Sequence, residues 1–346
     1  MKCVVAQYLL AMGRLVKARA GATAGSPIFR RTVHLTFVPD EEIGGKDGMG
    51  ELLKTDAFKR MAPVALALDE GLASTGEKNT VFYGERSPCL ILITATGPTG
   101  HGSRFIQGTA TSKLVRISEK ALAFRAEQEQ LLGWGKPADG CAHCEAKKLG
   151  DVTTLNLTML EAGVTMDGGK TFSLNVIPTS ARAGFDIRLT PNTSFDTLKE
   201  TLDGWCNAEE GVSWGFAPWS VPLTEHHITA IDAQKNPWWG VFKDGCASAG
   251  IDLEPEIFPA ATDSRFIRQL GIPAFGFSPL ANSPILLHEH DEYVTREVFL
   301  RGIDIYVQLL PKLCDAPRMA HEKGGAAMPP AKRSKRGEPA CAPCEP

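Results

Sequence analysis

The sequence predicts an α/β protein whose mainly parallel sheet is interrupted by a smaller α+β domain. Short apolar runs such as VALAL, at 64–68, alternate with helix-like segments toward both ends of the chain. Such runs are typical of strands that are buried on both faces. The middle of the chain instead places several strands between two helices. With 346 residues, 43% of them hydrophobic, the chain can form one large domain or two ordinary ones.

The first predicted domain takes its elements from both ends of the chain. In residues 1–20 the apolar positions recur at helical spacing and Gln7 interrupts them, which predicts an amphipathic helix rather than a signal peptide. The β-rich segment RTVHLTFV, at 31–38, ends at Pro39 and predicts a strand. The remaining elements predicted here are a helix at 49–60, a strand at 64–68, a helix at 236–249, a strand at 253–258, a short helix after Thr262, a strand at 273–277 and a helix at 296–313.

The middle of the chain has a different pattern of elements. They are strands at 79–85 and 88–97, a long helix at 111–132, strands at 152–160 and 172–188, and a helix at 195–208. We therefore predict a discontinuous domain of residues 1–86 and 220–314, an inserted domain of residues 87–219, and a disordered tail from 315 to 346 that is rich in Pro, Ala, Lys and Gly.

Charge and cysteine content exclude several classes of function. A net charge of −3 provides no basic surface for nucleic acid, and no apolar stretch approaches the roughly 20 residues needed to cross a membrane. The nine scattered cysteines predict a reducing compartment, and we expect the cytoplasm. The pairs Cys141–Cys144 and Cys341–Cys344 suggest either a four-thiolate zinc site or unpaired loop thiols. The tail segment AKRSKRG suggests a nuclear signal, a polyanion contact or simply a solvated basic tail.

Three clusters of acidic residues or histidines directly follow predicted core strands. They lie at 39–42 (PDEE), 69–71 (DEG) and 288–292 (HEHDE). In an open α/β sheet ligands bind beyond the carboxyl ends of the strands, so the clusters can converge, and mixed oxygen and nitrogen donors favour zinc. Taken singly, each cluster also suits a helix N-terminus or a hydrogen-bonded loop. The adjacent pair Glu41 and Glu42 could divide two tasks, one carboxylate binding the ion and the other taking a proton from water.

A family resemblance rests on a series of ordered blocks. FVPDEEIGG, LALDEG, ERSPC, TGPTGHGSRF, LNVIPTSARAGFDIR, PWWGVF, FPAATDSRFIR, FGFSP and LLHEHDE closely resemble the aminoacylases of the dimerising dinuclear-zinc amidohydrolase family, over about residues 1–314. The resemblance implies a homodimeric, zinc-dependent enzyme that hydrolyses N-acyl-amino acids to a carboxylate and a free amino acid.

The resemblance also implies roles for individual residues. Glu41 matches the general base, Glu42 and His288 match ligands of one zinc ion, and Glu70 matches a ligand of the second, with Asp69 as its competitor. A second set of matches concerns the inserted domain and the substrate. His101 resembles the histidine that stabilises the oxyanion in the partner's active site, Asn175 and Arg188 match the pair that holds the substrate carboxylate, and Arg265 is a further candidate for that carboxylate.

In the family, a His-x-Asp segment and a bridging aspartate supply two further zinc ligands, and both positions would precede Met1. With the ligands present we expect weak zinc binding and impaired turnover, because catalytic zinc has three protein ligands. Two alternatives stay open: a dipeptidase or other deacylase that uses the same centre, and a non-catalytic dimerising protein.

Overall fold

The computed structural model describes residues 1–20, 27–132, 147–220 and 222–319. They form two compact units, one from residues within 1–84, 227–255 and 262 onward, and the other from residues within 85–226 and 256–261. The segments with the two CxxC pairs and AKRSKRG lie outside the described residues. Among the described residues, no helix has both the length and the hydropathy that a membrane span requires.

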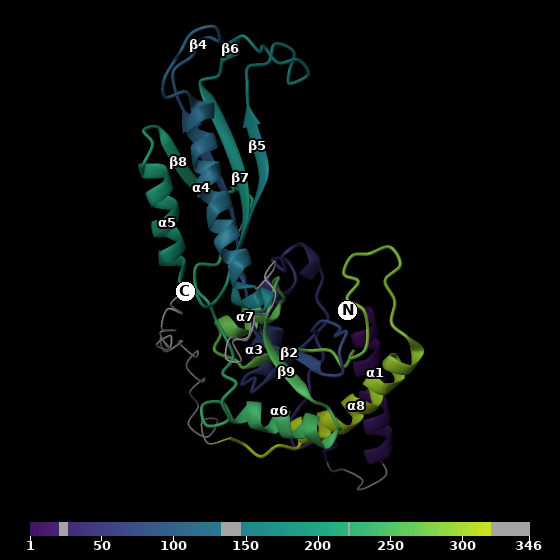
Figure 1. Ribbon diagram of the computed structural model, residues 1–346. Coiled ribbons are helices and arrows are strands. Elements are labelled where there is room, and N and C mark those ends of the chain that lie inside the picture. Colours follow the sequence, from purple (N-terminus) through teal and green to yellow (C-terminus); the bar gives the residue numbers. More distant parts are fainter. Residues whose placement is uncertain (21–26, 133–146, 221, 320–346) are drawn as a thin grey trace, which may run out of the picture. The chain divides into compact units, whose positions relative to one another are not determined.

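The first unit contains a four-stranded mixed sheet with helices around it (Figure 1). Its strand order is β1-β10-β2-β9, in which β1 and β10 are parallel and β10 and β2 are antiparallel. Its elements are α1 (Lys2–Arg19), η1 (Glu41–Ile43), α2 (Met49–Leu52), α3 (Asp56–Met61), β1 (Ala67–Asp69), β2 (Asn79–Glu85), α6 (Pro237–Ser248), β9 (Leu253–Phe258), α7 (Ser264–Gln269), β10 (Ala274–Phe277) and α8 (Arg296–Cys314).

Helix packing in this unit follows from the apolar spacing of α1 and α8. Val4, Ala11 and Leu15 lie on one face of α1 at helical spacing and are buried together with Gln7. Helix α8 begins at the cap Thr295, whose hydroxyl accepts a hydrogen bond from the backbone N–H of Val298. The core beneath the sheet is aromatic and includes Trp238, Phe242, Phe275, Phe277 and Tyr306.

The second unit is a four-stranded antiparallel sheet, ordered β5-β7-β3-β8, with α4 and α5 packed against it (Figure 1). A two-stranded ribbon of β4 and β6 lies at one end of this unit. Its elements are β3 (Ser87–Thr96), β4 (Gly100–His101), α4 (Ala110–Leu131), η2 (Leu149–Asp151), β5 (Thr154–Ala162), β6 (Val176–Ile177), β7 (Ser180–Leu189), α5 (Phe195–Asn207) and β8 (Val212–Phe216).

Alternation along β3 sets the buried face of this sheet. Cys89, Ile91, Ile93 and Ala95 are buried, and the residues between them are more exposed. Side chains from α4 and α5 belong to the same core cluster. The α/β class with a smaller α+β unit is therefore confirmed.

Two predicted strands are corrected by the structure. Residues 31–38 are not a strand, and no described strand pairs with them, so the β propensity of the segment has no ladder to join. Leu35 and Phe37 are consequently exposed. The predicted strand at 172–188 is broken, because only β6 and β7 form within it.

Candidate metal-hydrolase site

The loop that carries Glu41 and Glu42 is shaped by an unusual backbone. Asp40 has a φ of 63°, in the left-handed region that non-glycine residues rarely adopt, and its Oδ2 accepts a hydrogen bond from the backbone N–H of Asp47 at 2.8 Å. Gly48 packs against the same loop, where a Cβ would lie 2.0 Å from the carbonyl oxygen of Pro39. Side chains larger than hydrogen are therefore excluded at position 48.

His288 meets Glu42 across 246 residues of sequence. Its Nε2 lies 2.9 Å from Oε2 of Glu42. His288 also has a positive φ, of 60°. Because left-handed non-glycine residues concentrate at functional sites, two of them beside one contact support a binding role for this pair.

Asp69 and Glu70 stand where β1 ends beside its parallel neighbour β10. Ser264, which is buried, donates a hydrogen bond from its hydroxyl to Oδ2 of Asp69 at 2.7 Å. Gly276 lets β10 approach closely, since a Cβ there would lie 2.7 Å from the carbonyl oxygen of Glu70. The carboxyl end of this parallel pair therefore presents two adjacent carboxylates, as the sequence predicted.

The next turn is held by Ser278. Its hydroxyl accepts from the backbone N–H of Gly71 at 2.9 Å and donates to the carbonyl oxygen of the same residue at 2.8 Å. These two bonds fix the backbone that follows Glu70.

The acidic side chains of this unit raise one another's pKa values. Half-burial raises the pKa of Glu41 to about 7, with further contributions from the negative charges of Asp263, Glu42 and Asp69. Burial and the neighbouring Asp69 raise the pKa of Glu70 well above its ordinary range. Carboxylates gathered in this way favour a cation among them.

Asp263 is a site residue that sequence reasoning missed. Its side chain is buried, and among the neighbouring charges it contributes most to the raised pKa of Glu41. It stands at the N-cap position of α7 within the block FPAATDSRFIR, which follows a core strand, so its place after that strand was the available signal.

The donor chemistry of these residues fits a divalent metal, although the ligand set is partial. Glu42 and His288 supply a carboxylate and an imidazole at one point, a combination suited to zinc. Within the described residues, no group of three His, Cys, Asp or Glu side chains converges on a single point. Glu70 therefore lies among the neighbouring charged residues but does not form a three-residue cluster with Glu42 and His288.

Arg265 connects α7 to the loop that carries the glutamates. Its guanidinium donates to the carbonyl oxygens of Thr262 at 2.8 Å and Gly44 at 2.7 Å, and it stacks over the Phe266 ring at 4.6 Å. Its positive charge partly lowers the pKa of Glu41. Arg265 thus links α7 to the loop that carries Glu41 and Glu42.

In the second unit the ribbon brings His101 and Asn175 together. His101 pairs with Val176 across the ribbon, and the backbone N–H of Gly102 donates to the carbonyl oxygen of Asn175 at 2.8 Å. His101 is exposed, and its Nδ1 lies 2.8 Å from Oγ of Ser103. Both predicted residues are therefore exposed and lie on neighbouring segments of the chain.

Arg188 is already engaged within its own strand. Its guanidinium forms two hydrogen bonds to the carboxylate of Asp186, at 2.7 and 3.0 Å, on the same face of β7. Both side chains are about one-third exposed. A substrate carboxylate at Arg188 would have to share the guanidinium with Asp186.

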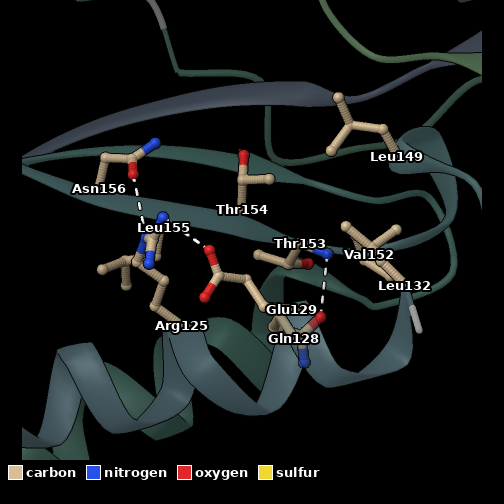
Figure 2. Close-up of a pocket in the computed structure, with 10 residues that line it drawn as sticks. All are labelled: Arg125, Gln128, Glu129, Leu132, Leu149, Val152, Thr153, Thr154, Leu155 and Asn156. Carbon is tan, nitrogen blue, oxygen red and sulfur yellow. Dashed lines mark hydrogen bonds and ion pairs between the residues drawn. The ribbon is translucent and has the colours of Figure 1, made fainter. Parts of the chain in front are cut away.

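A pocket beside the C-terminal half of α4 contains none of the predicted site residues (Figure 2). Its polar side chains satisfy one another: Arg125 bonds to Asn156 and pairs with Glu129, while Gln128 accepts from the backbone N–H of Thr153. The two charged side chains among the residues that line the pocket, Arg125 and Glu129, are thus already paired with each other.

Comparisons with known proteins identify the family of this chain. The sequence profile described as peptidase family M20/M25/M40 matches residues 1–312. Aminoacylase-1 of Dictyostelium discoideum is 51% identical over 314 residues, which cover 90% of this chain and 72% of that protein. Human aminoacylase-1 is 44% identical over 321 residues, covering 92% of this chain and 71% of that protein.

Solved structures show the same fold. A dinuclear metal-binding peptidase of the M20 family from Bacillus subtilis is similar with a TM-score of 0.57 at 14% identity, covering 90% of this chain and 71% of that one. The profile match spans most of the sequence, and the two relatives exceed 40% identity over nine-tenths of the chain. The chain therefore belongs to peptidase family M20/M25/M40.

Proposed function

We propose that this chain is a metal-dependent amidohydrolase that converts N-acyl-amino acids to a carboxylate and a free amino acid. Its relatives named aminoacylase-1 and its membership of a peptidase family support hydrolysis of an amide bond. The observation that carries the proposal is the 2.9 Å contact between Glu42 and His288, because it brings a carboxylate and an imidazole from two distant segments of the chain to one point.

The proposed metal is zinc. Glu42 and His288 would hold one ion, and Glu70 would contribute to a second. The hydrogen bond from Ser264 occupies one oxygen of Asp69, which favours Glu70 over Asp69 as the ligand. When bound, zinc supplies Lewis-acid polarisation and lowers the pKa of water.

Glu41 is the proposed general base. Its pKa of about 7 keeps it able both to accept a proton from water and to return that proton to the amine nitrogen near neutral pH. His101 of one subunit would donate from Nε2 to the substrate's carbonyl oxygen in the partner's active site as that oxygen becomes negative. Asn175, Arg188 and Arg265 would bind the substrate carboxylate, the arginines through charge-assisted hydrogen bonds.

We also propose that the second unit forms the interface of a homodimer. Large apolar side chains around the ribbon are almost fully exposed: Phe105 at 102%, Leu174 at 94% and Met166 at 81%. Apolar surface of this kind beside a proposed catalytic residue suits a second copy of the chain. The five described cysteines are free, which supports a reducing compartment such as the cytoplasm.

The test is hydrolysis of a panel of N-acetyl-amino acids and dipeptides by zinc-loaded protein. Glu41→Gln should lower kcat about 10²–10⁴-fold, because general acid–base catalysis contributes that much. Glu51→Gln is the matched control, since Glu51 forms only an exposed ion pair with Lys54. Its kcat should equal that of the unchanged protein.

Two other outcomes would replace the proposal. Turnover of dipeptides without N-acetyl-amino acids would identify a dipeptidase of the same fold. Dimeric, zinc-treated protein that turns over neither substrate would identify a non-catalytic member of the family.

A further inference from the structure

The bonds made by the His101 ring determine where its proton lies. The backbone N–H of Ser103 donates to Nδ1 of His101 at 3.2 Å. A backbone N–H cannot accept a hydrogen bond, so Nδ1 must be the unprotonated, accepting nitrogen. The neutral ring then carries its proton on Nε2. The hydroxyl of Ser103, 2.8 Å from the same nitrogen, adds a second donor.

The local backbone holds this arrangement in place. The N–H of Arg104 donates to the carbonyl oxygen of His101 at 3.1 Å, which closes a tight turn and brings Ser103 back onto the ring. The ribbon bond from Gly102 to Asn175 anchors the start of the turn. The Ile106 side chain packs over Gly100, where a Cβ would lie 2.3 Å from Cδ1 of Ile106 and would displace that side chain. Ser103 is therefore directed at Nδ1 by the path of the chain.

We propose that Ser103 is a positioning residue that fixes the tautomer of His101, so that Nε2 presents a proton rather than a lone pair. The proposal rests on the function proposed above, in which Nε2 donates to the substrate's carbonyl oxygen. The other tautomer would direct a lone pair at that oxygen and repel its growing negative charge. Ser103 acts only through His101 and does not itself contact the substrate.

The tautomer can be measured without any turnover. In protein with ¹⁵N-labelled histidine, long-range ¹H–¹⁵N spectra separate the protonated ring nitrogen from the unprotonated one, and His101→Gln identifies the signals of His101. The unchanged protein should show the proton on Nε2. In Ser103→Ala the ratio of the Nε2–H to the Nδ1–H tautomer should fall about two- to tenfold, since one of two hydrogen bonds is lost.

Two variants separate this effect from general damage to the ribbon. Ser103→Thr keeps a hydroxyl and should keep the original tautomer ratio. Thr99→Val removes a hydrogen bond within the same ribbon, from Oγ1 of Thr99 to the carbonyl oxygen of Ile177 at 2.7 Å, and leaves the contacts of Nδ1 intact. Its tautomer ratio should match that of the unchanged protein.

Hydrolysis rates then separate the role of Ser103 from the catalytic role of His101. Ser103→Ala should lower kcat by the factor by which it lowers the fraction of the Nε2–H tautomer, with little change in KM, and Ser103→Thr should restore it. A proton found on Nδ1 in the unchanged protein, or a ratio indifferent to Ser103→Ala, overturns the role of Ser103. Unimpaired hydrolysis by His101→Gln instead overturns the catalytic role proposed for His101, even where the tautomer responds as expected.

Discussion

Replacing Gly302 by alanine should destabilise the first unit, although alanine is the better helix former. Gly302 lies in α8 against α1, where a Cβ would come within 2.0 Å of Nε2 and 2.7 Å of Cδ of Gln7. The Gln7 side chain is fully buried and donates from Nε2 to the carbonyl oxygen of Phe299 at 3.0 Å. The amide therefore cannot move aside without losing this bond inside the core.

The expected loss in the free energy of unfolding has three contributions. Overpacking a core costs about 1–3 kcal/mol, and a displaced buried amide costs a further ~1–3 kcal/mol. The replacement of glycine by alanine inside a helix returns about 1 kcal/mol. We therefore expect Gly302→Ala to lower the free energy of unfolding by about 1–5 kcal/mol, as measured by urea denaturation.

Two further variants test whether the clash with the Gln7 amide causes the loss of stability. Gly13 lies in α1 with no atom within 4 Å of its would-be Cβ, so Gly13→Ala should be neutral or stabilising by up to about 1 kcal/mol. Combining Gly302→Ala with Gln7→Ala removes the clashing amide, so the double variant should lose less than the sum of the single losses. A Gly302→Ala protein as stable as the Gly13→Ala protein, or strictly additive losses, would refute the argument.

The remaining predictions concern the proposed site and the buried thiols. His288→Ala should weaken zinc binding, measured by chelator competition, by about 10–100-fold or more, whereas His290→Ala should not, because the structure gives His290 no contact with Glu42. Equal affinities would remove His288 from the ligand set. Arg188→Lys should raise KM about tenfold or more with kcat nearly unchanged, because lysine lacks the bidentate fork; a fall in kcat at constant KM would contradict carboxylate binding. Burial raises the pKa of Cys89 and of Cys246 to about 12, so both should stay protonated and resist iodoacetamide from pH 7 to 9.5 until urea unfolds the protein. Mass spectrometry of the two peptides measures this, and rapid labelling of the native protein would contradict it.

Local sequence patterns determined most of the secondary structure. The helical spacing of apolar residues predicted the helices at α1, α4, α5, α6 and α8, because each needs one continuous apolar face. Alternation and short apolar runs likewise predicted β3 and β10. The strand-end rule correctly placed Asp69 and Glu70 at the end of β1, whereas the strands expected before Glu41 and before His288 do not form.

Contacts between distant residues were decided only by tertiary structure. Residues 31–38 have the composition of a strand, yet a strand needs a neighbouring ladder, and no described strand supplies one. The engagement of Arg188 by Asp186 is a local case: residues two apart in a strand share a face, but only the structure shows that their rotamers form the two hydrogen bonds. Asp263 had no distinguishing feature in the sequence beyond its place after a core strand.

Sequence by itself determined the class of the fold, the order of most of its elements and the family, because these depend on local periodicity and on blocks of residues read in order. Only the tertiary structure decided that Glu42 meets His288, that Ser264 bonds to Asp69 and that Ser103 directs its N–H at His101. Such contacts depend on ångström-scale packing and backbone paths, and the composition of a segment does not specify them.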